Sequence, residues 1–223
     1  MSDLLRAAGV ELSAPADGEL QLRHADLDWL RAVFVAFGHG AYIKGQALHV
    51  PTADAVAVEH AALAAVAPEA VLFDLDGVLA DIARRTPIAN VADLQAVAAQ
   101  YPVGVVTTCP VRVAESVLER HGFLDFVGAV VGSEDGPCKP DPFPVREALR
   151  RLNKQRAWML GDNPSDVLAA RGAAVVPLGV MPRGAGAESH IDRLRAAGAV
   201  RLVEGVASLR ALLPAAAGDA PPP

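Results

Sequence analysis

The segment AVLFDLDGVLAD, residues Ala70–Asp81, decides the fold of this chain. An apolar run of strand-forming residues ends there in Asp74 and Asp76, and Gly77 follows them directly. Side chains on an extended strand repeat every two residues, so both carboxylates point to the same side. Two like charges that close repel each other. The spacing therefore predicts that another group compensates them.

Five further apolar runs follow and alternate with helix-like stretches: GVVTTCP, FVGAVVGS, AWMLGDN, AAVVPLGV and AVRLVEG. Continuous apolar strands separated by helices are typical of a parallel sheet covered on both faces. Residues typical of helix starts and ends separate the runs: Pro110, Asp141–Pro142, Asn163–Pro164, Gly122 and Gly172. We therefore predict an α/β fold with a doubly wound, mostly parallel, Rossmann-like sheet. Ligands of such sheets bind at the carboxyl ends of the strands.

The residues before Pro68 predict a small α/β appendage. ELQLRH and AYIKGQALHV are expected strands, and DLDWLRAVFVAFG and TADAVAVEHAALAAVA are expected helices capped by Asp26 and Thr52. This βαβα order resembles the last part of the small domain of fold-type I aminotransferases. We expect an appendage over residues 1–67, the main α/β domain over 68–213, and a disordered tail, PAAAGDAPPP, over 214–223.

Composition narrows the class of partner. The chain has 223 residues, 52% hydrophobic content and a net charge of -6, which argues against a general surface for nucleic acids or anionic membranes. The most apolar stretch, AALAAVAPEAVLF, is interrupted well short of the roughly 20 residues that a membrane-spanning helix needs. The N-terminus lacks a signal-peptide pattern, and Cys109 and Cys138 form no CxxC. We expect a cytoplasmic protein with ordinary thiols.

Polar residues end or follow four of the predicted strands: Asp74 and Asp76, then Thr107 and Thr108, then Lys139, then Asp162 and Asp166. The corresponding motifs, DLDGV, VVTT, CKPDP and GDNPSD, resemble those of the haloacid dehalogenase superfamily of phosphohydrolases. KPDPFP is similar to its phosphoglycolate-phosphatase-like group, of the subfamily IA type. Four motifs in order, each at an expected strand end, are far more specific than one DxDG. The resemblance covers roughly residues 70 to 213.

This resemblance implies a Mg²⁺-dependent phosphatase that hydrolyses a small phosphate monoester through an aspartyl-phosphate. Asp74 would be the nucleophile, and Asp76 would act as general acid and then as general base. Thr107 and Thr108 would hold the phosphoryl oxygens at the start of the helix after Pro110.

The resemblance also implies roles for the remaining motif residues. Gly77 lets the chain leave the strand end close to the ligand, and Lys139 would offset the charge of Asp74 and the phosphoryl group. The implied magnesium ligands are oxygens of four acids: Asp74, Asp76 (through its backbone carbonyl), Asp162 and Asp166.

Several of these residues have simpler structural interpretations. Asp76 before glycine is a common turn signal. Asp166 stands three residues after Asn163, where an acid stabilises a helix start, so a cap and a metal ligand both remain open. Arg84 and Arg85 could contact substrate, although solvated side chains are our preferred interpretation.

Other functions fit these motifs less well. A phospho-acceptor receiver-like signalling domain uses Asp, Thr and Lys on a similar sheet, but it has no counterpart to GDNPSD. A catalytically silent interaction module would require degraded motifs. A dehalogenase would lack the second acid, Asp76.

The spacing of the motifs leaves little room for a lid. About 30 residues separate Asp76 from Thr107, enough for one covering helix and a loop but not for a cap domain. The substrate stays open between histidinol phosphate, which would suit an aminotransferase-like appendage, phosphoglycolate and sugar phosphates.

Overall fold

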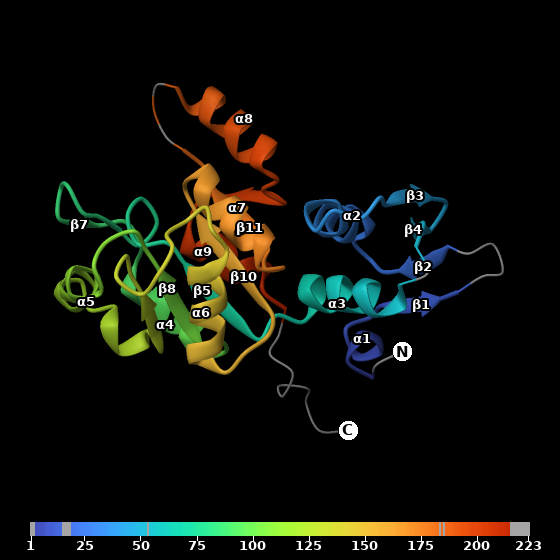
Figure 1. Ribbon diagram of the computed structural model, residues 1–223, viewed down its shortest axis with the longest axis horizontal. Helices are drawn as coiled ribbons and strands as arrows, with labels where there is room; N and C mark the ends of the chain where they lie inside the picture. Colours follow the sequence, from blue (N-terminus) through green and yellow to red (C-terminus); the bar gives the residue numbers. More distant parts are fainter. Residues whose placement is uncertain (1–2, 15–18, 53, 183, 185, 215–223) are drawn as a thin grey trace. The chain divides into compact units, whose positions relative to one another are not determined.

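The computed structural model describes residues 3–14, 19–52, 54–182, 184 and 186–214 of the chain (Figure 1). It divides into two compact units, Met1–Pro68 and Glu69–Pro223. Of the tail expected to be disordered, residues 215–223 lie outside the described residues, whereas the carbonyl of Pro214 accepts a hydrogen bond from the Tyr101 hydroxyl. None of the described helices has the length and apolar character that crossing a membrane requires.

The Met1–Pro68 unit is a four-stranded antiparallel sheet with helices, in the strand order β1-β2-β4-β3. Its elements are α1 (Asp3–Ala7), β1 (Glu11–Ser13), β2 (Leu20–Arg23), α2 (Leu27–Ala36), β3 (Tyr42–Lys44), β4 (Ala47–Val50) and α3 (Ala55–Val66). The Asp26 cap of α2 is confirmed, because its carboxylate accepts the Trp29 N–H at 2.8 Å.

Two predictions for this unit were wrong in detail. AYIKGQALHV is not one strand but the hairpin β3–β4, because Gly45 takes up a left-handed conformation (φ 62°) and reverses the chain. Thr52 does not cap α3. Asp54 does, with its carboxylate accepting the Ala57 N–H, while the Thr52 hydroxyl accepts the N–H of Asp54.

The Glu69–Pro223 unit contains the predicted parallel sheet, and all six predicted strands are confirmed. They are β5 (Ala70–Phe73), β8 (Val103–Val106), β9 (Ala129–Val131), β10 (Ala157–Gly161), β11 (Val176–Val180) and β12 (Arg201–Val203), in the order β12-β11-β10-β5-β8-β9. Every neighbouring pair is parallel. Both central strands, β5 and β10, are buried along their whole length, as continuous apolar sequence predicts.

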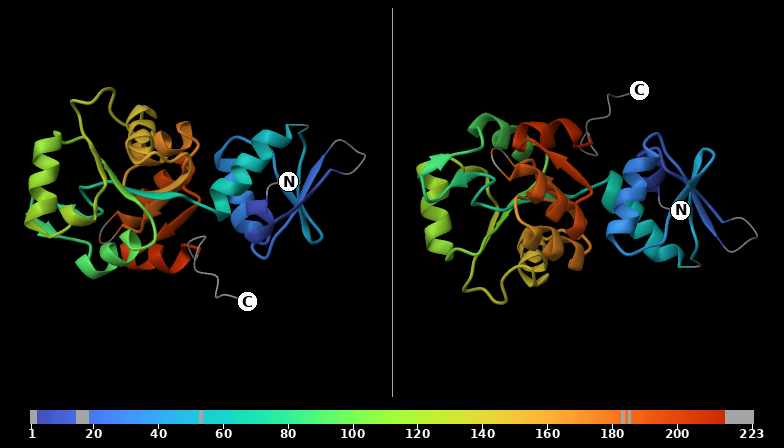
Figure 2. Two further views of the ribbon diagram at one scale, coloured as in Figure 1. Left: turned by 90° about the horizontal axis from the view of Figure 1, so that it is seen from below. Right: turned by 90° about the horizontal axis from the view of Figure 1, so that it is seen from above.

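Helices cover both faces of this sheet. Figure 2 shows α6 and α7 on one face and α4 and α9 on the other, with α5 at the β9 end. The helices are α4 (Val91–Ala98), α5 (Val111–Arg120), the 3₁₀ turn η1 (Leu124–Phe126), α6 (Phe143–Leu152), α7 (Pro164–Gly172), α8 (Ala187–Ala197) and α9 (Val206–Leu212). The core consists of aliphatic side chains such as Leu72 and Leu160, both fully buried, and each contributes about 1.5–3 kcal/mol.

The strand order places a topological switch between β5 and β10. From β5 the chain proceeds through β8 to β9 on one side, and then returns to β10 and continues through β11 to β12 on the other. A crevice opens at the carboxyl ends of two strands where the winding reverses, which is where doubly wound proteins bind ligands. Asp74 follows β5 and Asp162 follows β10, so the predicted residues meet at this crevice.

Only a short excursion separates β5 from β8. Between Asp76 and Thr107, where every residue is described, the chain forms the two-stranded hairpin β6 (Ala80–Asp81) and β7 (Thr86–Pro87), and then α4.

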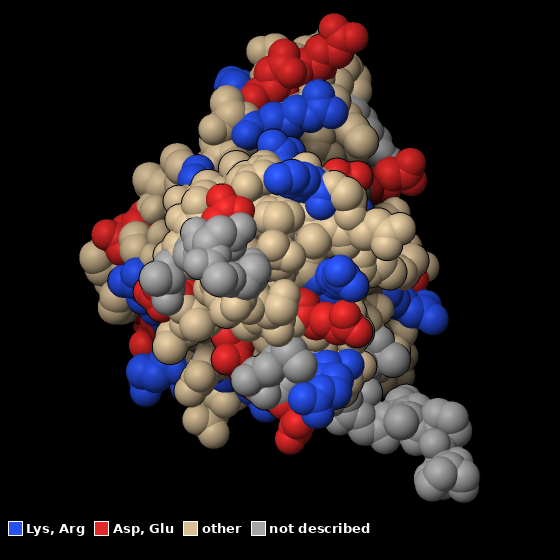
Figure 3. Space-filling view, turned by 90° about the vertical axis from the view of Figure 1, so that its right-hand side faces the viewer, with Lys and Arg blue, Asp and Glu red and all other residues tan. Residues whose placement is uncertain are grey.

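On the face of the molecule in Figure 3, basic and acidic side chains are interspersed among uncharged residues, as on an ordinary solvated surface.

Candidate active site

A cleft of about 330 Å³ lies at the carboxyl ends of β5 and β10. All eight residues predicted from the motifs line it: Asp74, Asp76, Gly77, Thr107, Thr108, Lys139, Asp162 and Asp166. Three further residues, which the motifs did not assign to catalysis, join them: Asp81, Asn163 and Ser165. The cleft therefore collects side chains from four separate strand ends.

The centre of the cleft is a buried lysine between two aspartates. Lys139 Nζ lies 2.6 Å from Asp74 Oδ1 and 2.5 Å from Asp166 Oδ1. Lys139 Nζ also donates to the carbonyl of Val106, the last residue of β8, at 2.9 Å. The ammonium group thus fixes the nucleophile candidate relative to two neighbouring strand ends.

Asp166 caps the start of α7 with one carboxylate oxygen and contacts Lys139 with the other. One carboxylate oxygen accepts the Asn163 N–H at 2.9 Å and so stabilises the start of α7. Its other oxygen faces Lys139, and the residue is only 2% exposed. Gly161 makes this packing feasible, because a side chain there would collide with that of Asp166.

Gly77 sits where no other residue fits. Its φ of 85° lies in the left-handed region. A Cβ at this position would also fall on the Asp162 carboxylate. The DxDG sequence therefore brings the strand end of β5 into direct contact with the loop after β10.

Asp162 has a support that sequence reasoning missed. The His190 Nε2 of α8 lies 2.6 Å from the backbone carbonyl of Asp162, and an Arg193 guanidinium N–H donates to His190 Nδ1 at 2.8 Å. With Nδ1 accepting, Nε2 carries the proton and donates to the carbonyl. A lone histidine 28 residues downstream gives no sequence signal for such a contact.

Asp76 has a different environment from the other acids. Its Oδ1 accepts the backbone N–H of Ile82 at 2.9 Å, so the carboxylate is held by the β6–β7 hairpin. The Gly77 N–H donates to the carbonyl of Ala80 at 3.0 Å and closes the turn. Asp76 therefore lies on the hairpin side of the cleft, with its side chain outside the acidic cluster described below.

The Thr108 amide, just before α5, is available to a ligand. The N–H of Thr107 donates to the Val131 carbonyl, that of Cys109 to Thr107 Oγ1, and that of Val111 to the Glu134 carboxylate. In the described part of the chain no acceptor takes up the N–H of Thr108, which lines the cleft. This amide suits the expected contact with an anionic oxygen.

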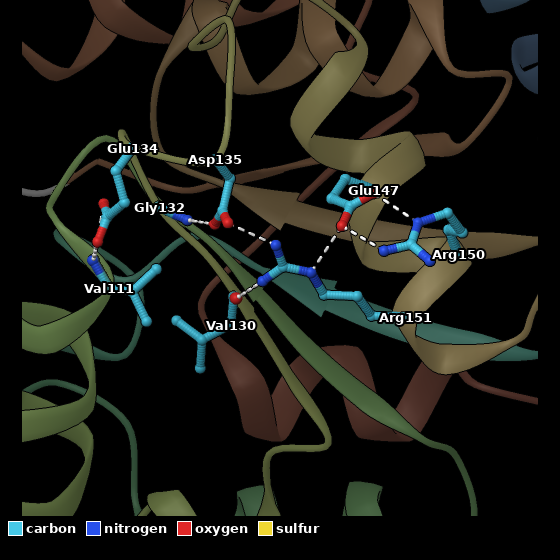
Figure 4. A network of polar contacts seen from close by, with 8 residues as sticks. All are labelled: Val111, Val130, Gly132, Glu134, Asp135, Glu147, Arg150 and Arg151. Carbon is cyan, nitrogen blue, oxygen red and sulfur yellow. Dashed lines mark hydrogen bonds and ion pairs between the residues drawn. The ribbon is translucent and has the colours of Figure 1, made fainter.

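A polar network anchors the segment that carries Lys139 (Figure 4). Arg151 on α6 bridges Glu147 of the same helix, the Asp135 carboxylate and the Val130 carbonyl. Asp135 in turn accepts the Gly132 N–H at 2.9 Å. The loop after β9 is thereby tied to α6 at one end, while Glu134 ties it to the start of α5.

Burial and charge shift the ionisation of the central groups. Burial, together with the Asp166 carboxylate, raises the pKa of Asp74 to about 7, although Lys139 opposes the shift. Burial also raises the pKa of Asp162, with Asp166 adding to it. For Lys139, burial favours the neutral amine, but Asp74 and Asp166 outweigh it and raise the pKa.

The surplus of negative charge fits a divalent cation. Oxygens of Asp74, Asp162 and Asp166 lie within 4.8 Å of one another. Hard carboxylate oxygens are the ligands that Mg²⁺ prefers. Burial and then repulsion from Asp166 raise the pKa values of Asp74 and Asp162, and Lys139 offsets only part of the charge of the three acids, so a cation would stabilise their ionised forms.

Fold and site together define a doubly wound α/β protein with an acidic, lysine-containing centre at its topological switch point. Residues 85–180 match the family model described as haloacid dehalogenase-like hydrolase. A structure of similar fold is that of a HAD phosphatase from Thermococcus onnurineus, with a TM-score of 0.53 and 17% identity over 66% of this chain and 99% of that one. Residues 85–180 are therefore similar to haloacid dehalogenase-like hydrolases, and the Glu69–Pro223 unit shares their fold.

Curated relatives match a shorter stretch. A phosphoglycolate phosphatase of Rhodospirillum rubrum is 41% identical over 85 residues, which are 37% of this chain and 35% of the relative. The corresponding enzyme of Vibrio cholerae is 33% identical over 85 residues, 37% of this chain and 38% of the relative. The chain thus spans little more than a third of the length of these relatives.

Proposed function

We propose that this chain is a Mg²⁺-dependent phosphatase that hydrolyses the phosphate monoester of a small metabolite through an aspartyl-phosphate. The observation that carries the proposal is Asp74, a buried carboxylate at the end of β5 that contacts Lys139 and belongs to the acidic cluster. Similarity to phosphoglycolate phosphatases and the family match support it.

Asp74, Asp162 and Asp166 would hold the ion, with the Asp76 carbonyl as a further ligand. When bound, Mg²⁺ would neutralise charge on the phosphoryl oxygens and keep the Asp74 carboxylate ionised. Lys139 and the Thr108 N–H would bind the same oxygens from the protein side. Thr107 would orient this amide through the tight turn that its hydroxyl closes with Cys109.

The two chemical steps use two carboxylates. An Asp74 oxygen attacks phosphorus, the bond from phosphorus to the ester oxygen breaks, and Asp76 delivers a proton to the departing alkoxide. Asp76, now ionised, takes a proton from water, whose oxygen attacks phosphorus and releases phosphate and the Asp74 carboxylate. The Ile82 amide keeps Asp76 oriented on the leaving-group side.

The test is hydrolysis of phenyl phosphate by the full chain with and without Mg²⁺. We expect activity that EDTA abolishes, and a loss of at least about a thousandfold for Asp74→Asn, because the isosteric amide cannot act as nucleophile. Circular dichroism and thermal unfolding should show an intact fold in the variant. Full activity in chelator, or labelled phosphate trapped on a residue other than Asp74, would contradict the proposal.

A screen of phosphorylated metabolites then addresses the substrate. Phosphoglycolate is the first candidate because the similar enzymes of Vibrio cholerae and Rhodospirillum rubrum are phosphoglycolate phosphatases. Histidinol phosphate and sugar phosphates complete the panel. The ranking by kcat/KM identifies the preferred ester.

A further inference from the structure

A second hollow, of about 460 Å³, lies between α5 and the segment that contains the β6–β7 hairpin. Figure 1 shows α5 and β7 at the same end of the Glu69–Pro223 unit. Apolar side chains and arginines line the hollow together. We define the arginine groove by six of its lining residues: Ile82, Arg85, Arg112, Val113, Val117 and Arg120.

The arginines of the groove lack acid partners. In the described part of the chain, no carboxylate forms an ion pair with Arg85, Arg112 or Arg120. Some arginines elsewhere in the same unit do have acid partners, as in Arg84 with Asp81 and Arg156 with Glu69. Three guanidinium groups that no described carboxylate neutralises, around one hollow of a protein with net charge -6, therefore form a local binding surface for an anion.

The position of Arg112 reinforces this conclusion. It lies in the first turn of α5, which has no acidic residue there. The positive end of the helix dipole disfavours a cation at this place, so Arg112 does not stabilise the helix. An external anion between Arg112 and its neighbours would remove the conflict.

The groove continues the cleft along the chain on both sides. Asp81 lines the cleft and the next residue, Ile82, lines the groove. Thr108 lines the cleft, and Arg112 follows four residues later. From Arg112 to Arg120, one face of α5 then runs about 12 Å away from the cleft at 1.5 Å per residue.

The direction of the leaving group points to the same groove. Asp76, the proposed proton donor to the ester oxygen, is held by the N–H of Ile82. The part of the substrate beyond that oxygen therefore lies on the hairpin side. The fully described segment between Asp76 and the start of β8 contains no cap domain to bind it, because that segment forms only the hairpin and α4.

We propose that the arginine groove binds a second anionic group, a carboxylate or a second phosphate, at the far end of the phosphate-ester substrate. The apolar side chains of Ile82, Val113 and Val117 would contact the intervening carbon chain. This inference rests on the proposed phosphatase function and narrows its substrates to esters with two anionic ends.

The test compares ω-carboxyalkyl phosphates of increasing chain length with their carboxamides, which have the same shape without the charge. Alkane bisphosphates form a second arm and distinguish a phosphate from a carboxylate at the far end. For the wild type at low salt we expect kcat/KM at one chain length to favour the carboxylate over the carboxamide by at least about tenfold. Added salt should reduce this ratio.

The matched variants are the double substitution Arg112→Gln with Arg120→Gln (the groove variant), and the double substitution Arg195→Gln with Arg210→Gln (the control variant), which removes the same net charge. Arg195 on α8 and Arg210 on α9 are exposed and do not line the groove. In the groove variant we expect the ratio of kcat/KM for the carboxylate to that for the carboxamide to fall close to one. In the control variant we expect this ratio to stay at the wild-type value. Because the readout is a ratio, general effects on turnover cancel. An unchanged ratio in the groove variant, or no charge preference in the wild type, would overturn the inference.

A binding measurement separates this inference from the proposed function. Calorimetric titration with the ω-carboxyalkyl phosphonate and its carboxamide needs no turnover. If the protein does not hydrolyse phenyl phosphate but binds the carboxylate form more tightly, the result supports the groove and contradicts the proposed phosphatase function. If the protein hydrolyses phenyl phosphate but binds both phosphonates equally, the result supports the phosphatase function and contradicts the groove as an anion-binding site.

Discussion

At the scale of single residues, the structure gives Asp166 contacts that its sequence position did not indicate. Its position three residues after Asn163 is explained by capping alone, so the sequence left a cap and a metal ligand both open. In the structure its second oxygen contacts Lys139 and lies within the acidic cluster. The cap and the cluster use different oxygens of one carboxylate, so the local signal could not reveal both.

We therefore predict that Asp166→Asn and Asp162→Asn weaken Mg²⁺ binding to a similar extent, each by at least about tenfold, since each removes one charged oxygen of the cluster. In the Asp166→Asn variant the side-chain amide oxygen can still accept the Asn163 N–H, so the fold should persist. Calorimetric Mg²⁺ titration of both variants measures this. A clearly milder effect of Asp166→Asn would reduce Asp166 to a helix cap.

Ionisation of Asp74 gives a prediction for the metal-free protein. Its folded pKa of about 7 lies above the ordinary value of 3.8, so the folded state binds the proton more tightly than the unfolded state. The resulting stabilisation is complete below about pH 4 and is lost as the pH rises through 7. Between about pH 5.5 and 8 we expect the free energy of unfolding to fall by about 1–2 kcal/mol more in the wild type than in Asp74→Asn.

Urea unfolding in EDTA at both pH values measures the difference. Mg²⁺ should reverse it, because bound metal favours the ionised carboxylate. Parallel pH profiles for wild type and Asp74→Asn would show that the Asp74 carboxyl keeps an ordinary pKa.

At the scale of elements, the strands of the large sheet were predictable, whereas the short hairpins were not. The strands β5, β8 and β10 are continuous apolar runs, because both of their faces are buried, and four of the six strands end in or are followed by a polar motif. The two-residue strands β6 and β7 have no such pattern, and β7 contains Pro87. They are held by backbone contacts to neighbouring residues, such as the Ile88 N–H to the Leu79 carbonyl.

The contacts that hold the site residues in place from distant parts of the sequence could not be predicted either. Glu134 reaches the Val111 N–H over 23 positions, and His190 reaches Asp162 over 28. Their partners are backbone groups, which carry no sequence identity. The residues that line the cleft can be predicted from motifs at strand ends. The groups that orient these residues cannot, because their contacts depend on how loops and helices pack.

The turn between β5 and β6 yields a prediction at this scale. Gly77→Ala would place a methyl group against the Asp162 carboxylate and strain a left-handed backbone. We expect Mg²⁺ affinity and phenyl phosphate turnover to fall by at least about tenfold, because the acidic cluster must open.

Gly122→Ala is the matched control. Gly122 also has a positive φ, of 71°, but an added Cβ would meet nothing closer than Val91 Cγ2 at 3.8 Å. It should cost only about 1 kcal/mol of stability and leave metal binding intact. Equal effects of both substitutions on Mg²⁺ affinity would assign the loss to backbone strain rather than to the Asp162 contact.

At the scale of the whole molecule, every strand of the parallel sheet and every site residue lies within Glu69–Pro223. Glu69 belongs to this framework, because its carboxylate accepts the Gln155 N–H and pairs with the Arg156 guanidinium. A truncated chain beginning at Pro68 retains these contacts. It contains a complete core of its own, which is the requirement for independent folding.

The truncated chain also tests the role of the first 67 residues, for which two proposals stand: that they cover the cleft, or that they only extend the packed structure. If the truncated chain unfolds cooperatively, we expect phenyl phosphate turnover within about twofold of the full chain under either proposal, because a small ester needs little covering. A second truncation beginning at Asp74 removes the central strand β5 and should not fold, which controls for fortuitous activity.

The substrate profile of the chain beginning at Pro68 then decides between the proposals. A cover excludes water and contacts the part of the substrate that projects from the cleft. Its removal should raise KM for the preferred metabolite by about tenfold, while phenyl phosphate is little affected. An unchanged profile in a folded truncation would exclude the covering role. Aggregation of this truncation would favour the packing role, because a stabilising unit protects apolar surface rather than the site.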